Sequence, residues 1–167
     1  METKLIKVKS GINFVLSRIA AVLLTIMTFL VLYQVFTRYI LNNPSAFTEE
    51  LVRYLLIWTS FIGAAYAFST RQHMALLLIY EKVGEKEKRN LMILADLLVL
   101  LFALFIMTIG GTKLAISARM EYSALLGIPR GLVYSVAPLS GLFIVFIQCI
   151  NIWEDLAGKV LKEEETL

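Results

Sequence analysis

The stretch IAAVLLTIMTFLVLYQVFT, residues 19–37, contains nineteen residues and no charged side chain. The hydrocarbon core of a bilayer is about 30 Å thick, and an α-helix needs about 20 residues to cross it. Arg18 precedes the stretch and Arg38 follows it, so a cation marks each end. We therefore predict a first transmembrane helix over residues 15–39.

The sequence contains three further uncharged stretches. They have seventeen, sixteen and twenty-three residues: 54–70, 97–112 and 131–153. The last is long enough to cross a bilayer without help. The first of the three is also long enough, because the flanking Arg53 and Arg71 can extend their side chains to the lipid headgroups.

The middle stretch is the shortest, and it reaches spanning length only if it begins near Leu91. It then carries Asp96 inside its first turns. With this stretch accepted, the chain has four transmembrane helices in a single transmembrane domain, residues 1–167. The predicted spans are 15–39, 49–70, 91–112 and 130–153.

The composition agrees with a membrane protein. Hydrophobic residues make up 59% of the chain and charged residues 17%, and the mean hydropathy is +0.76. A soluble domain has about 45–50% apolar and about 25% charged residues. A disordered chain, a coiled coil and a secreted disulfide scaffold are excluded too, and the lone Cys149 cannot form an internal disulfide. The expected fold class is all-α integral membrane.

The positive charges predict the orientation of the chain. Eleven Lys and Arg residues flank one side of the predicted membrane and five flank the other. Cytoplasmic loops carry the excess of positive charge, so both termini are expected in the cytoplasm. The first span is too long for a cleaved signal peptide and lacks a cleavage site, so it is expected to be retained. Residues 1–18 alternate apolar residues with lysines, which fits either an amphipathic surface helix or a basic anchor.

Local signals predict where two of the helices begin. Asn42-Asn43-Pro44 should end the first helix. Thr48 is then the expected N-cap of the second helix. Glu49 would lie in its first turn and could pair with Arg53, four residues later. Pro129 is expected to start the fourth helix.

A proline lies inside the fourth span. Pro138 removes the hydrogen bond to the carbonyl of Tyr134, so a kink is expected there. Such a kink could line a binding site, but it more often only shapes how neighbouring helices pack.

The residues that carry chemistry are sparse. The chain has one histidine, His73, and one cysteine, and the predicted topology keeps them apart. We find no nucleophile motif, metal-ligand spacing or phosphate-binding loop, and no basic run with exposed aromatics for nucleic acid. We therefore predict no catalytic, metal-binding or substrate-binding residue, no cofactor and no nucleic-acid partner. Asp96 is the only carboxylate predicted deep in a span. The alternative function is therefore a stand-alone, four-helix, homo-oligomeric small transporter that uses Asp96.

Small residues recur at helical spacing in three spans. Gly63 and Ala67 form one pair four residues apart, and Ser60 and Ala64 form another. Gly110-Gly111 lies in the third span, and Ala137 and Gly141 lie in the fourth. Such pairs let helix backbones approach closely. They could serve packing within the chain or docking to another membrane protein, and the pattern does not separate the two.

Two blocks of sequence match a known pattern. The first is Arg38-Tyr39, then Phe47-Thr48-Glu49-Glu50-Leu51-x-Arg53-Tyr54, then Trp58-x-x-Phe61-x-Gly63-Ala64, then His73. The second is Leu126-Gly127-Ile128-Pro129, then Tyr134, Pro138 and Gly141. Over roughly residues 15–153 the chain resembles the DctQ-like small membrane subunit of tripartite ATP-independent periplasmic (TRAP) transporters. It departs from the family in having Phe47 in place of the usual Trp, and Leu77 in place of an acid.

The resemblance implies a role and partners. The small subunit would associate with a large multi-helix membrane subunit that carries sodium and substrate. A periplasmic binding protein would deliver the substrate, a carboxylate-bearing anion of the dicarboxylate or sialic acid type. The chain would lie in the bacterial inner membrane and brace the large subunit. The residues we expect at subunit interfaces or in structural roles are Arg38, Glu49, Glu50, Arg53, Trp58, Gly63, Ala64, Ala67, His73, Tyr134, Pro138 and Gly141.

Overall fold

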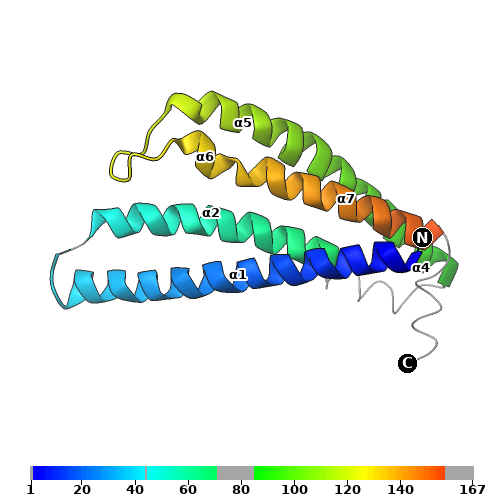
Figure 1. The fold of residues 1–167 in the computed structure, drawn as a ribbon, viewed down its shortest axis with the longest axis horizontal. Helices are drawn as coiled ribbons and strands as arrows, with labels where there is room; N and C mark the ends of the chain where they lie inside the picture. Colours follow the sequence, from blue (N-terminus) through cyan, green and yellow to red (C-terminus); the bar gives the residue numbers. More distant parts are fainter. Residues whose placement is uncertain (1, 44, 71–84, 157–167) are drawn as a thin grey trace.

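The computed structural model describes residues 2–43, 45–70 and 85–156 (Figure 1). Four helical stretches in this part of the chain are long and apolar enough to cross a membrane. The all-α membrane fold with four spanning helices is therefore confirmed. His73 and Leu77 lie outside the described residues.

The first helix, α1, runs from Glu2 to Tyr39 without a break. The lysine-rich N-terminal segment is thus continuous with the first span and does not form a separate surface helix. The apolar part, Lys9–Tyr39, has 31 residues. At 1.5 Å per residue this part is about 46 Å long, which exceeds the hydrocarbon thickness of about 30 Å. The helix must therefore tilt or extend beyond the hydrocarbon.

The second helix, α2, runs from Ala46 to Ser69, and its N-cap residue is Ser45. The prediction that Thr48 is the N-cap is therefore wrong. Thr48 lies inside the first turn, where its hydroxyl donates to the carbonyl oxygen of Ser45 at 2.9 Å. The turn before α2 includes Asn42 with a φ of 49°, a left-handed conformation that asparagine tolerates better than most residues. The helix can therefore begin three residues earlier than the Thr-Glu-Glu motif suggests.

The third span is built from four segments: α4 (Glu85–Phe102), the π-helix η1 (Ala103–Gly110), α5 (Gly111–Ser117) and the 3₁₀ turn η2 (Ala118–Met120). The Thr108 hydroxyl donates to the carbonyl oxygen of Ala103, five residues earlier, at 2.9 Å. The apolar helix continues to Met120 and does not stop at residue 112. Lys113 therefore lies within the helix, although its charge suggested the end of the span.

The fourth span is interrupted where the proline signal placed a kink. A short helix, α6 (Arg130–Tyr134), follows Pro129, and α7 (Val136–Leu156) follows after Ser135. Pro138 lies in the first turn of α7 and has no N–H to donate to the Tyr134 carbonyl. Helical hydrogen bonding resumes directly after Pro138, where the Leu139 amide donates to the Ser135 carbonyl oxygen at 3.3 Å.

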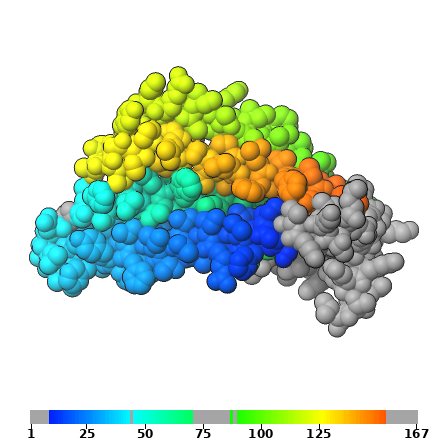
Figure 2. All heavy atoms as spheres, in the orientation of Figure 1, coloured from blue at the N-terminus to red at the C-terminus, as the bar shows by residue number. Residues whose placement is uncertain are grey.

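In the view of Figure 1 the spans follow one another in the order α1, α2, the fourth span and the third span. α1 packs against α2, α2 packs against α7, and α7 packs against α4 and η1. Half of the residues of the fourth span are buried, compared with 6% in the first. The core forms where α2, η1 and α7 meet, and it includes Ile62, Ala65, Met107 and Ile144. α7 is thus the central helix, and α1 lies along one edge of the molecule (Figure 2).

Glycines set the distance between the third and fourth spans. A Cβ added at Gly141 would lie 3.0 Å from the Thr108 backbone nitrogen, and one at Gly111 would lie 3.0 Å from the Pro138 ring. A Cβ at Gly131 would lie 2.8 Å from the Arg119 Cα. The two backbones therefore approach more closely than larger residues permit.

This packing generates a stability prediction. Gly131→Ala and Gly141→Ala should each destabilise the protein by about 1–3 kcal/mol, because the added methyl meets backbone that cannot move aside easily. Gly63→Ala is the matched control, because its Cβ would meet nothing within 4 Å. We expect a lower thermal unfolding midpoint in detergent for the first two variants only. A wild-type midpoint in all three would contradict the close packing.

Candidate functional site

The end of α1, the start of α2 and residues 121–129 lie at the same end of the molecule, which we call the loop end (Figure 1). One carboxylate connects two of its elements. Glu50, in the second turn of α2, accepts a hydrogen bond from the backbone amide of Leu125 at 3.1 Å. It also accepts one from the Tyr54 hydroxyl at 2.8 Å, and the Ser123 hydroxyl faces the same carboxylate. Glu50 therefore holds the 121–129 loop against the start of α2.

The 121–129 loop is itself tightly folded. Tyr122 and Pro129 form an antiparallel bridge, and the Ser123 amide donates to the Ile128 carbonyl oxygen at 3.0 Å. Gly127 has a φ of 63°, a conformation that a side chain disfavours. Arg130 and Glu121 close the base of the loop with an ion pair at 3.5 Å. The loop thus presents a defined surface at the loop end.

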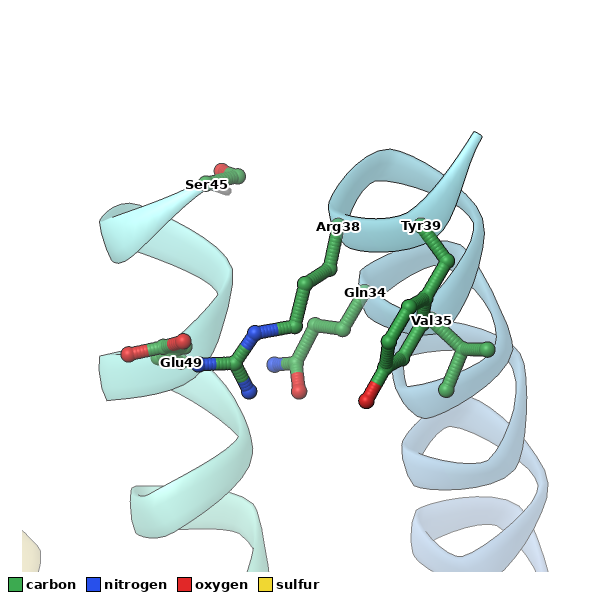
Figure 3. Close-up of a pocket in the computed structure, with 6 residues that line it drawn as sticks. All are labelled: Gln34, Val35, Arg38, Tyr39, Ser45 and Glu49. Carbon is green, nitrogen blue, oxygen red and sulfur yellow. The ribbon is translucent and has the colours of Figure 1, made fainter. Parts of the chain in front are cut away.

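A polar pocket of 170 Å³ lies beside it, between the ends of α1 and α2. Arg38 and Gln34 extend from α1 toward Glu49 on α2 (Figure 3). The two charges share the pocket, yet no ion pair within 4 Å joins them among the described residues. The buried Nε2 atom of Gln34 has no hydrogen-bond partner among the residues that the structure describes. The pocket therefore contains an unused hydrogen-bond donor, a cation and an anion.

The expected pair of Glu49 and Arg53 is not formed. Both side chains are exposed, and the ion pairs of the described residues do not include them. The structure therefore divides the charged motif into separate roles. Glu50 binds the loop, Glu49 lies in the pocket with Arg38, and Arg53 stays on the surface.

The small residues of α2 lie on two different faces. Gly63 contacts no other helix closely, since an added Cβ would meet nothing within 4 Å. Leu56 is exposed, and Leu56, Gly63 and Ala67 recur at spacings of seven and four residues along one side of the helix. Ser60 and Ala64 instead line an apolar groove toward the third span. Sequence spacing alone did not distinguish these faces.

Trp58, Pro138 and Gly141 pack within the chain, and Tyr134 lies next to a helix break. Trp58 is partly buried and packs against the core, so it is not confined to an interface position. Pro138 and Gly141 lie against the third span, where Gly141 abuts Thr108. Tyr134 is the last residue of α6, next to the break in the fourth span.

The structure contains a buried polar cluster that the sequence patterns did not predict. Gln148 and Asn151 on α7 are both 0% exposed, and the Asn151 Nδ2 donates to the Gln148 Oε1 at 2.7 Å. Asp96 on α4, the helix packed against α7, is 4% exposed. The sequence feature that indicates this cluster is the pair Gln148 and Asn151, two amide side chains three residues apart in an apolar span. The Ser69 hydroxyl likewise donates to Asn13 and links α2 to α1.

Comparison with known proteins gives consistent similarities. Residues 27–158 match the family model of the DctQ component of tripartite ATP-independent periplasmic transporters. The chain is 29% identical over 155 residues to the sialic acid TRAP transporter small permease protein SiaQ of Vibrio cholerae, covering 92% of this chain and 87% of that protein. It is 29% identical over 134 residues to a Haemophilus influenzae protein whose name describes a TRAP transporter small permease, covering 80% and 82% of the two chains.

The loop contact of Glu50 can be tested directly. Glu50→Ala should speed hydrogen exchange at the Leu125 amide several-fold, because this amide loses a charged acceptor. Glu49→Ala is the matched control and should leave that exchange rate unchanged. Exchange at Leu125 that is equal in both variants and the wild type would show that the carboxylate does not hold the loop.

Proposed function

This chain belongs to the DctQ family of TRAP transporters, and we propose that it is the scaffold subunit of a sodium-coupled, binding-protein-dependent importer of a carboxylate-bearing anion. Small permease proteins of TRAP transporters are transporter components, so the chain is not an enzyme. The family and the four apolar helices indicate a multi-pass protein of the inner membrane. Family membership also implies a complex with a large permease subunit and a binding protein.

A stripe of small residues along one side of α2 is the observation that carries the scaffold role. Leu56 in this stripe is exposed, Gly63 has space for an added Cβ among the described residues, and Ala67 continues it along the helix. Small residues let a partner helix approach to backbone contact, and membrane helices associate through such packing. In this proposal a helix of the large subunit packs along this stripe.

The loop end supports the second part of the role, docking of the binding protein. With both termini in the cytoplasm, as the charge distribution favours, the loop end faces the periplasm. The Glu50-tethered loop and the pocket of Arg38 and Glu49 then form the surface offered to a soluble partner. Charged groups at such a surface would steer encounter and set orientation.

The substrate belongs to the partners in this proposal. Sodium and the transported anion would be bound by the large subunit, and the small subunit would hold neither. The Vibrio cholerae relative is named for sialic acid, which bears a carboxylate. A sialic acid or a C4-dicarboxylate is thus the substrate class we propose.

The α2 stripe predicts the effect of one substitution on assembly. Gly63→Leu should sharply lower the amount of large subunit that co-purifies with the tagged chain in mild detergent, because a branched side chain blocks backbone contact. Gly63→Ala should retain assembly close to wild type. Normal recovery of the large subunit with Gly63→Leu would place the interface elsewhere.

A substitution at Asp96 distinguishes the scaffold role from a stand-alone transporter. Under the scaffold proposal, Asp96→Asn should leave sodium dependence of uptake intact once the complex is assembled. A homo-oligomer of stable mass that transports alone, and stops when Asp96 is changed, would replace the scaffold proposal.

The docking role predicts an effect on the encounter rate. Glu49→Lys should lower uptake at limiting binding-protein concentration while leaving the yield of the membrane complex unchanged, since surface charges act mainly on association. Uptake should recover as binding-protein concentration rises. Wild-type uptake at every concentration would remove Glu49 from the docking surface.

A further inference from the structure

An apolar groove of 510 Å³ opens between α2 and the third span, with Ala137 of α7 in its lining. Its small lining residues are Ser60, Ala64, Gly110, Gly111 and Ala137, and its large ones are Phe61, Phe68, Phe102, Ile106, Met107 and Leu114. On the third span, the lining extends from Phe102 to Leu114, across the whole π-helix η1. The groove thus runs along a large part of the apolar stretch of this span.

The lining offers almost no polar atom, so the groove cannot hold water favourably. In a membrane, an opening of this kind and depth is filled by hydrocarbon. The question is whether the occupant is an ordinary neighbouring lipid or one that the protein selects.

Two cations near the groove point to a selected lipid. Arg53 lies seven residues from the first residue of α2, and Lys113 lies seven residues from Met120, the last residue of η2. At 1.5 Å per residue, each lies about 10 Å inside the loop end. Both are exposed, and the hydrogen bonds and ion pairs of the described residues give neither a partner.

Helix geometry places both cations on the continuation of the groove walls. Arg53 precedes the wall residues Ser60 and Ala64 by seven and eleven residues, which keeps it on the same side of α2. Lys113 directly precedes Leu114 and lies one turn beyond Gly110. Long cationic side chains at this depth extend toward the headgroups, where phosphate is the available anion.

We propose that this groove binds one anionic phospholipid, with an acyl chain along the groove and its phosphate at Arg53 and Lys113. Arginine and lysine both bind phosphate, and the bonds are charge-assisted. Two cations at matching depth favour a headgroup with net negative charge over a zwitterionic one, which carries its own ammonium.

A transmembrane helix of a partner is the competing occupant. Such a helix would separate Arg53 and Lys113 from the lipid headgroups. Cations without an anionic partner are costly inside a membrane. An anionic lipid satisfies the apolar lining and the two cations together. The charge arrangement therefore favours the lipid.

Native mass spectrometry of the complex purified through this chain tests the proposal. Phosphatidylglycerol and phosphatidylethanolamine are added in equal amounts, and the lipid retained per chain is counted. We expect phosphatidylglycerol to be retained preferentially. The double variant Arg53→Gln with Lys113→Gln should lower its retention about tenfold or more, as the loss of charge-assisted bonds implies.

Two further variants separate the groove from general electrostatics. Ala64→Phe fills the groove and should lower phosphatidylglycerol retention although both cations remain. Arg38→Gln removes a cation at the same end but away from the groove, and should leave retention unchanged. Recovery of folded protein on size exclusion is measured for each, so that a folding defect is recognised.

Three results would overturn the proposal: equal retention of the two lipids by the wild type, equal loss with Arg38→Gln, or no loss with the double variant. If Ala64→Phe disrupts assembly with the large subunit while lipid retention stays normal, a partner helix occupies the groove instead. The lipid count can be made on the chain with or without the large subunit, so it remains distinct from the scaffold test.

Discussion

The close approach of the third and fourth spans is the constraint on which the rest of the structure depends. Gly111, Gly131 and Gly141 remove the side chains that would hold the two backbones apart. Contact at this distance lets α7 pack against η1 on one side and α2 on the other. In a bilayer, where lipid is as apolar as the helices, such van der Waals contact is the main source of association. The central position of α7 follows from it.

Around that centre, the chain leaves much of its apolar surface uncovered. α1 contributes little to the core, and α2 exposes Leu56 and leaves space beside Gly63 within the described residues. A soluble protein could not expose such surfaces, but a membrane subunit can, because lipid or a partner subunit covers them. The loop end is organised differently, by Glu50 and by the bonds within the 121–129 loop. Rigid polar contacts thus occur where water reaches the protein, and open apolar faces occur where it does not.

The sequence could predict the number of spans, the helix break near Pro138 and the family, because each rests on local composition or a motif. It could not predict that the third span continues past Lys113. A single charge looks like a helix end in a linear reading, although a lysine side chain can extend to the headgroups from within a helix. The motif at Glu49, Glu50 and Arg53 predicted a polar end of α2, but only the fold shows that Glu50 meets Leu125, 75 residues away. The same holds for Gly63 and Ala64, whose adjacent positions face different surroundings.

The π-helix of the third span has a consequence for insertions and deletions. A π-helix closes its bonds over five residues, so the segment Ala103–Gly110 accommodates more residues per turn than an α-helix does. Loss of one residue there would let the segment return to α-helical geometry. Because the wider π turn already accommodates one residue more than an α-helical turn, the residues beyond it would keep close to their present rotational position. Gly111 would then still face Pro138, and α4 would keep its contacts. The same deletion in an α-helical part of the span would instead turn every residue beyond it by about 100°, the rotation per residue of an α-helix with 3.6 residues per turn.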